Sequence, residues 1–434
     1  MITDVQTQRD LELFRARDGG ASVLGTLDRT RTSGGRKRLW KMVEVPLDTA
    51  EQIRSRQHSI RFLASANVPF PVPEELIKGA RNYVESNYAT VCAGGRVRRL
   101  ADVTWIALRY PELIRFARAG LASTRQLMER VVRFVEGVSG AGLPSELADI
   151  FDEIRALDRD LRAVIQGAHT RRAVLVADRT LRETFRPRMD QLVETVYQLD
   201  ALNSAAQLLR EGYILPDVED EGTHLEGEGL WHPFLPEAVT NPVRLRGGET
   251  LVFLTGPNMA GKTTYLKAVG LALYLGQCGL PVPAQRLRFT PIDRFITGLA
   301  PEDNLRQGIS YFLAEVRRVK EVVSAVASGE RTVAIFDEVF RGTNVTDALE
   351  ASKAVLLGCS RAPTSMFLFS SHLSELAEEL ADRESVRFCY FDGDLDGSEL
   401  RFDYRLKAGV SNRRFGMELL RREGLPDLLE SIPA

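Results

Sequence analysis

Apolar residues in the first half of the chain recur at spacings of three and four positions. The spacing runs through three long stretches, 104–138, 144–166 and 179–209, among arginine, glutamate and aspartate residues. It places the apolar side chains on one face of a helix, and no run of alternating β-branched residues interrupts it. The pattern predicts an all-helical domain over residues 1–215, whose long helices form a bundle or act as levers.

Beyond residue 230 the pattern changes to short apolar runs separated by helix-like stretches. The runs lie at residues 251–255, 333–336 and 366–370. Such alternation is typical of an α/β domain with a mostly parallel sheet, expected here over residues 230–434. The residues between the two domains, 216–229, are acidic and contain glycine, and they predict a linker or a surface loop. Residues 386–391 and 399–406 flank the sequence DGDLDG and predict an antiparallel hairpin.

Composition places the chain among folded proteins and excludes several classes. Hydrophobic residues make up 44% and charged residues 27% of the 434 positions. The 57 lysine and arginine residues nearly balance the 59 acidic residues, so nucleic acid could be bound only through a local patch. The four cysteines lie far apart, which argues against a zinc ribbon or a thioredoxin-like site. No apolar run is long enough to cross a bilayer, and we expect a cytoplasmic protein without a membrane partner.

The sequence GPNMAGKT, residues 256–263, has the spacing of a phosphate-binding loop. It follows the apolar run LVFLT and opens a helix-like stretch, which is the context this motif requires. We expect Lys262 to reach the β- and γ-phosphates of ATP and Thr263 to hold Mg²⁺. A glycine-rich turn that matches by chance is the alternative. The expected nucleotide-binding residues of the loop are Gly256, Pro257, Asn258, Met259, Ala260, Gly261, Lys262, Thr263 and Thr264.

Two further apolar runs end in residues suited to ATP hydrolysis. The first ends in Asp337, an expected Mg²⁺ ligand, and Glu338, an expected general base, for which a helix-capping acid is the alternative. The second ends in His372, which we expect to contact the γ-phosphate, although a strand-end histidine can also be structural. Ser310 precedes a helix-like stretch and could cap the γ-phosphate bound by a second subunit; a plain helix N-cap is equally consistent. Together with Lys262, these residues fit a catalytic site of the ABC-type P-loop ATPases, which work as head-to-tail dimers.

These motifs resemble those of the MutS family of DNA mismatch repair ATPases. The resemblance covers essentially all of residues 230–430 and is carried by TGPNMAGKTTYLKAVGL, GQCGLPVPA, FDEVFRGTNVTDALE and SSHLSEL. In the first half, LDRTRTSGGRKRLWKMVEVPL and YQLDALNSAA are similar to the start and the end of the family's core and lever domain. Two positions depart from the family pattern. Tyr311 stands where threonine is usual, and Ala238 stands where an aromatic residue stacks on adenine, so we expect other apolar contacts to hold the base.

The resemblance implies a homodimer that uses ATP and Mg²⁺ and couples hydrolysis to lever movement on mismatched or branched DNA, in mismatch repair or recombination control. It also implies that the mismatch-recognition and connector domains are missing, and that the DNA clamp is absent or reduced to residues near 167–177. DNA contacts would then reach the backbone, through basic patches at residues 29–41 or 96–99. An ABC-type ATPase whose levers dock a protein or an RNA is the alternative. The intact motif residues disfavour an inactive scaffold.

Overall fold

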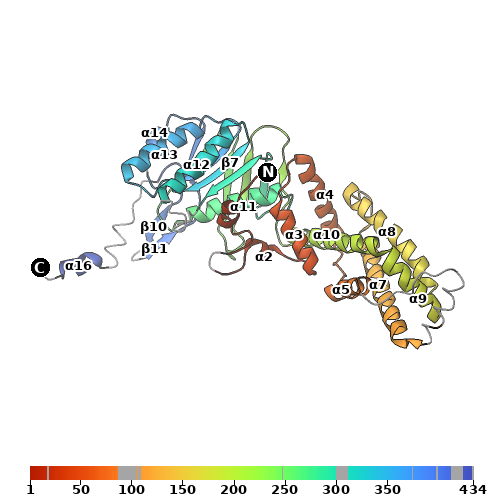
Figure 1. Ribbon diagram of the computed structural model, residues 1–434. Coiled ribbons are helices and arrows are strands. Elements are labelled where there is room, and N and C mark those ends of the chain that lie inside the picture. Colours follow the sequence, from red (N-terminus) through yellow and green to blue (C-terminus); the bar gives the residue numbers. More distant parts are fainter. Residues whose placement is uncertain are drawn as a thin grey trace. The chain divides into compact units, whose positions relative to one another are not determined.

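The computed structural model describes residues 1–16, 19–86, 105, 109–246, 248–299, 311–373, 375–396, 399–411 and 424–432. The chain divides into two compact units (Figure 1). The first contains residues 1–27, 45–54 and 212–434, and the second contains residues 28–44 and 55–211. This division differs from the single boundary expected near residue 215, because the N-terminal residues pack with the sheet of the first unit.

A six-stranded sheet forms the centre of the first unit. All neighbouring strands run parallel except the edge strand β12, which pairs antiparallel with β9. The strands β4, β7 and β8 are buried along their whole length, which is why they read as continuous apolar runs. The predicted α/β domain with a mostly parallel sheet is confirmed. In spatial order the strands are β12 (Lys407–Ala408), β9 (Val386–Tyr390), β4 (Leu251–Thr255), β8 (Met366–Ser370), β7 (Thr332–Asp337) and β6 (Arg294–Gly298).

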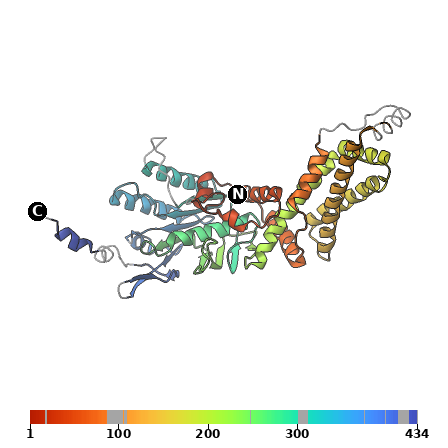
Figure 2. The ribbon, with the colours of Figure 1, turned by 90° about the horizontal axis from the view of Figure 1, so that it is seen from below.

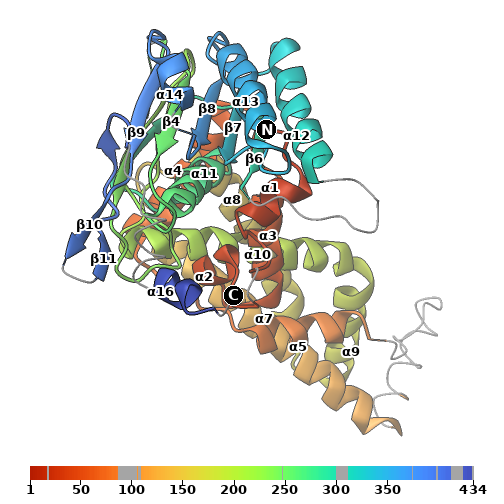
Figure 3. The ribbon, with the colours of Figure 1, turned by 90° about the vertical axis from the view of Figure 1, so that its left-hand side faces the viewer.

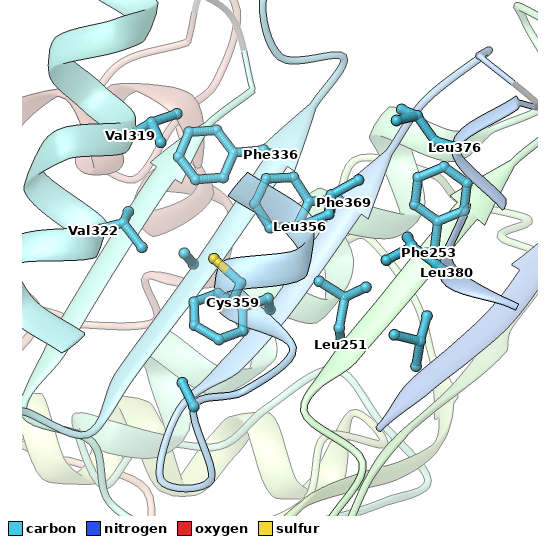
Figure 4. Close-up of a cluster of buried hydrophobic side chains, with 14 of the residues drawn as sticks. Leu251, Phe253, Val319, Val322, Phe336, Leu356, Cys359, Phe369, Leu376 and Leu380 are labelled. Carbon is cyan, nitrogen blue, oxygen red and sulfur yellow. The ribbon is translucent and has the colours of Figure 1, made fainter. Parts of the chain in front are cut away.

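Helices cover both faces of this sheet (Figure 3). One face carries α12 (Tyr311–Ala327), α13 (Val345–Cys359) and α14 (Glu375–Leu380), and the other carries α11 (Lys262–Gln277). The core between the sheet and the first three helices is apolar. Figure 4 shows that its side chains come from strands and helices alike, including Phe253, Val319, Phe336, Leu356, Phe369 and Leu380. This packing fixes the strand ends that carry the site.

Residues 216–229, expected to form a linker or a surface loop, contribute to a second sheet of four strands. Its strand order is β1 (Asp217–Val218), β5 (Arg286–Phe289), β2 (Leu225–Leu230) and β3 (Asn241–Leu245). Much of the stretch expected to be a linker is therefore strand. Leu225 and Leu230 are buried, and the acidic residues and glycines between them hid the strand pattern from sequence reasoning.

The expected hairpin near the end of the chain is wrong in its pairing. The first of its segments is β9, which runs parallel to β4 in the six-stranded sheet. The antiparallel hairpin forms instead between β10 (Gly393–Asp396) and β11 (Glu399–Phe402). The sequence DGDLDG is thus largely strand β10 rather than a turn. The described chain ends with α16 (Leu425–Glu430).

The second unit is helical, as the sequence predicts. Its helices α7 and α8 pack on each other and on α9, and α10 packs on α3 (Figure 2). α7 begins at a proline, seven residues after the expected start, which is the helix position that tolerates proline best. No helix in the described ranges is long and apolar enough to cross a membrane. The α-helices of the second unit are α3 (Ser33–Glu44), α5 (Glu74–Val84), α7 (Pro111–Val138), α8 (Ser145–Gln166), α9 (Arg171–Arg179) and α10 (Arg186–Arg210). α4 (Ala50–Ala66) begins in the first unit and ends in the second, and α1 (Val5–Asp10) and α2 (Val23–Leu27) belong to the first unit.

Candidate nucleotide-binding site

The loop between β4 and α11 has a backbone that few residues other than glycine can follow. Gly256 has φ +136° and Gly261 has φ +101°. A Cβ atom on Gly256 would lie 2.5 Å from the carbonyl oxygen of Phe391, so this position accepts no side chain. Met259, also left-handed, stands 79% exposed on the loop. The loop ends at the N-terminus of α11, where free N–H groups favour an anion.

Lys262 lies inside this loop. Its Nζ donates hydrogen bonds to the carbonyl oxygens of Gly256 at 2.8 Å and of Pro257 at 3.0 Å. It also lies 4.0 Å from Oε1 of Glu338. Burial lowers the pKa of Lys262, and the charges of Glu338 and Asp337 oppose that effect. The lysine charge is therefore held at the centre of the loop, close to both carboxylates.

Asp337 accepts two hydroxyl hydrogen bonds at the end of β7. Thr263, in the first turn of α11, donates to its Oδ2, and Ser370 donates to its Oδ1. The pairing of β7 with β8 places Asp337 directly opposite Ser370. A carboxylate beside a threonine hydroxyl is an oxygen donor set of the kind that Mg²⁺ prefers, so Thr263 and Asp337 fit such an ion. Ser370 was not expected from the sequence.

Glu338 is buried and surrounded by cationic groups. Its left-handed backbone, with φ +56°, turns away from the strand, and its N–H donates to the carbonyl oxygen of Ser370 at 3.0 Å. Its Oε2 pairs with Arg341 and lies 3.2 Å from Nδ1 of His372. Burial raises the pKa of Glu338, but the hydrogen bond from His372 and the charges of Arg341 and Lys262 outweigh it and hold the pKa below its ordinary value. The carboxylate is ionised at neutral pH.

A buried glutamate on α12 holds the loop that follows Glu338. Glu315 accepts hydrogen bonds from the N–H groups of Arg341 and Gly342, both at 3.2 Å. Burial raises the pKa of Glu315, against the effect of these hydrogen bonds. No sequence pattern predicted this contact between α12 and the loop at residues 341–342. Ser310 itself lies outside the described residues.

A pocket of about 760 Å³ opens beside the phosphate-binding loop. Its polar lining comes from the loop residues Asn258, Lys262 and Thr263 and from Glu338 and Arg341. Its apolar and aromatic lining includes Trp231, Leu235, Ala238, Val239, Phe391 and Tyr404. A lining that combines charged and apolar groups matches the two halves of a nucleotide.

The wall of the pocket contains two residues that were not expected there from the sequence. Tyr404 lies against the loop, with Cδ1 3.2 Å from where a Cβ of Gly261 would be. His232 is buried in the wall, and its Nδ1 accepts a hydrogen bond from the N–H of Phe234. Burial, together with the charge of Lys267, lowers the pKa of His232 to about 4, so the ring is neutral at neutral pH.

Comparison with known proteins matches both halves of the chain. Residues 6–222 match the family model of MutS domain III, and residues 252–431 match that of MutS domain V. Among the similar proteins is the "DNA mismatch repair protein MutS" of Persephonella marina, 29% identical over 245 residues, which cover 55% of this chain and 28% of that protein. The protein of the same name from Natronomonas pharaonis is 30% identical over 257 residues, covering 57% and 30%.

A third relative, "DNA mismatch repair protein MutS 2" of Halobacterium salinarum, is 31% identical over 248 residues, which cover 55% of this chain and 28% of that protein. The match therefore spans less than a third of the length of each of these relatives. The model of domain III alone covers half of the present chain, and the model of domain V covers most of the remainder. The chain belongs to the MutS family and carries its lever domain III and its ATPase domain V.

Proposed function

We propose that this chain binds ATP in the pocket beside residues 256–264 and hydrolyses it with the help of Mg²⁺. One observation carries the proposal: Lys262, Thr263 and Glu338 line a single pocket, and Asp337 lies directly behind it as the hydrogen-bond partner of Thr263. The N–H groups of the loop and the charge of Lys262 bind the β- and γ-phosphates. The apolar lining residues, among them Trp231 and Val239, take the base in place of an aromatic residue at Ala238.

Hydrolysis requires a water molecule aligned with the γ-phosphorus. Glu338 is ionised, and in this proposal its carboxylate accepts a hydrogen bond from that water and orients it. A carboxylate with a lowered pKa is a weak proton acceptor, so orientation and polarisation are its main contributions. His372 holds Glu338 from the end of β8 and would contact the γ-phosphate. Thr263 and Asp337 would hold Mg²⁺, which neutralises charge on the phosphate oxygens when bound.

Two substitutions test this assignment. Glu338→Gln should lower kcat about 100-fold or more, because it removes the negative charge that orients and polarises the attacking water, while the Kd for ATP stays nearly constant. Lys262→Ala should abolish ATP binding. The exposed Glu384, in the same unit, provides the control Glu384→Gln, which should behave as the wild type. Phosphate release and nucleotide binding are measured side by side, with the melting temperature of each variant. Wild-type turnover by Glu338→Gln would show that the assignment of Glu338 is wrong.

We also propose that DNA is the partner and that the active form is a homodimer. The names of the relatives support DNA, and exposed basic residues on the helices of the second unit support contacts to phosphates. Phosphate contacts position a protein without reading bases, so a single mismatch should gain less than about tenfold over perfect duplex. A four-way junction offers several backbones at an angle and should bind more tightly than the mismatched or the perfect linear duplex.

Competition among homoduplex, a G·T mismatch and a four-way junction at fixed salt checks these expectations. The affinity for each DNA should also fall steeply with salt. A preference of more than about tenfold for the mismatch would contradict the backbone-contact model. Binding that is insensitive to salt would favour the alternative, in which the helices dock a protein.

A further inference from the structure

The second unit exposes two aromatic rings side by side just before α7. The side chains of Trp105 and Tyr110 are 59% and 50% exposed, and their ring centroids lie 5.8 Å apart in an edge-to-face arrangement. Neither ring belongs to the core or to the nucleotide pocket. Large aromatic rings are normally buried because their burial stabilises the fold, so an exposed pair is suited to an external partner.

Arginine side chains follow this pair along α7. Arg115 and Arg125 are exposed and have acidic neighbours on the same helix, Glu112 and Glu129. Arg109 and Arg118 are also exposed, and neither has an ion-pair partner among the residues that the structure describes. The acidic side chains of this stretch are thus already paired, and positive charge remains uncompensated beside the two rings.

A groove of about 550 Å³ is lined by residues of the same helix, α7, that follows the aromatic pair. Arg118, Arg125 and His169 line it together with the apolar residues Leu121, Ile165 and Val174. Two more exposed arginines, Arg171 and Arg172, stand in the first turn of α9, directly after the groove residue His169 and the helix cap Thr170. The groove is therefore basic at its edge, with an apolar floor.

We propose that the aromatic pair and this groove form a binding surface for a single strand of nucleic acid, with Trp105 and Tyr110 stacking on unpaired bases and Arg118 and Arg125 contacting phosphates. Aromatic rings bordered by arginines are the usual construction of such surfaces, because every base offers a face to stack on and every nucleotide a charge. A duplex, whose bases are already stacked, could use only the arginines. This inference rests on the proposed function in one respect, that the partner is nucleic acid. It adds to that function a preference for DNA that carries an unpaired strand.

The test uses the full chain and labelled oligonucleotides: a dT 20-mer, an rU 20-mer and a 20-base-pair duplex, measured by fluorescence anisotropy. Trp105→Ala and Tyr110→Ala should each weaken dT binding about tenfold, as loss of one base–aromatic stack does, and change duplex binding by less than about twofold. Trp105→Phe keeps a stacking ring and should retain most of the affinity, whereas Trp105→Leu should not.

Arg118→Ala should weaken the binding of single strand and of duplex alike. It should also reduce the slope of log K against log salt concentration by about one. Arg133→Ala, an exposed arginine on α7 that does not line the groove, is the matched control and should have little effect. If both dT and rU bind and both lose affinity in the Trp105 variants, stacking of unpaired bases on this ring is confirmed. The ratio of the two affinities then shows whether the surface prefers DNA or RNA. Unchanged dT binding by both aromatic variants would overturn the proposal while leaving DNA binding itself intact. A wild-type chain that binds no nucleic acid would overturn both.

Discussion

Glu338 is held by basic side chains that a γ-phosphate would also attract. Arg341 and His372 share its Oε2, and Lys262 lies 4.0 Å from its Oε1. Under the proposed function, ATP binding draws these groups toward the phosphate and weakens their hold on the carboxylate. The charge that lowers the pKa of Glu338 would then decrease, and the residue would become a better proton acceptor when its substrate arrives.

Replacing Arg341 should therefore change the pH dependence of hydrolysis. The folded-state pKa of Glu338 is depressed, so activity that needs its ionised form is present above that pKa and lost as the pH falls through it. Arg341→Ala removes one cause of the depression, and the acid limb of the kcat/KM profile, which reports the nucleotide-free enzyme, should move to higher pH. Arg361→Ala, which changes an exposed arginine that does not line the pocket, serves as control. An acid limb at the same pH in both variants would contradict this electrostatic account.

Gly256 offers a test of the loop geometry by stability. Its φ of +136° and the 2.5 Å approach of the Phe391 carbonyl both exclude a side chain, so Gly256→Ala should lower the free energy of unfolding by about 1–3 kcal/mol and abolish ATP binding. Gly329 has φ +81° but open space around its Cβ position. Gly329→Ala should thus lower the free energy of unfolding by only about 1 kcal/mol, which is the cost of a left-handed backbone at a residue with a side chain. Urea unfolding of both variants measures the difference, and equal losses would mean that the contact with Phe391 relaxes.

An N-terminal arm, residues 2–13, organises several elements of the first unit. Ile2 forms a parallel bridge with Arg294 and so extends the edge of the six-stranded sheet at β6. Asp10, in α1, accepts hydrogen bonds from the Thr297 hydroxyl at 2.8 Å and the Leu299 N–H at 3.0 Å. Glu12 reaches Lys267 of α11 at 2.6 Å. The arm thereby ties the helix that follows the phosphate-binding loop to the end of β6.

The buried carboxylate of Asp10 is expected to dominate the stability of this arm. Asp10→Ala removes the one oxygen, Oδ2, that accepts both hydrogen bonds, leaves two buried donors without this acceptor, and should cost about 1–3 kcal/mol in the free energy of unfolding. Asp382→Ala changes an exposed aspartate and should cost almost nothing. The two variants are compared by urea denaturation. Equal unfolding midpoints would show that the contacts of Asp10 contribute little.

Sequence patterns predicted those elements whose environment is uniform along their length. The strand β4 and the helix α8 lie within a residue of their expected bounds, since a fully buried strand and an amphipathic helix each leave a continuous signature. β2 escaped because its glycines and acids dilute the apolar pattern. β9 received the wrong partner because one of its neighbours, β4, lies more than a hundred residues away, and the other, β12, has only two residues and begins at Lys407, just beyond the expected segment.

The same distinction applies to the site. Lys262, Thr263, Asp337, Glu338 and His372 stand in local motifs, and the structure brings them together. Ser370 and Tyr404 have no local signal: the first is defined by strand register, and the second by a loop that follows β11. The contact of Glu315 with residues 341–342 likewise depends on how α12 packs.

On the scale of the whole molecule, the chain passes between its two units four times, at residues 27–28, 44–45, 54–55 and 211–212. Several covalent connections therefore link the ATPase domain to the lever domain. Under the proposed function, these connections let a change in nucleotide state alter DNA affinity. By linkage, DNA must then alter nucleotide affinity by the same factor. In a two-fold symmetric homodimer each such change would involve both subunits.

A dimer with composite sites predicts complementation between two inactive chains. If Ser310 acts on the nucleotide bound by the other subunit, a dimer of one Ser310→Ala chain and one Lys262→Ala chain keeps one intact site, made of Lys262 from the first chain and Ser310 from the second. Its other site carries both substitutions. An equimolar mixture forms such heterodimers in half of its dimers, so about a quarter of the wild-type ATPase rate should return.

If Ser310 acts within its own subunit, neither site of the heterodimer is intact, and the mixture should stay as inactive as the two parent chains. ATP turnover is measured after the chains are mixed under conditions that allow subunit exchange, and exchange is confirmed with differently tagged chains. Both parents must also keep the wild-type melting temperature. Restored activity in the mixture, absent from each parent alone, would require that one nucleotide site takes residues from two subunits. Its absence despite proven exchange would contradict the composite site.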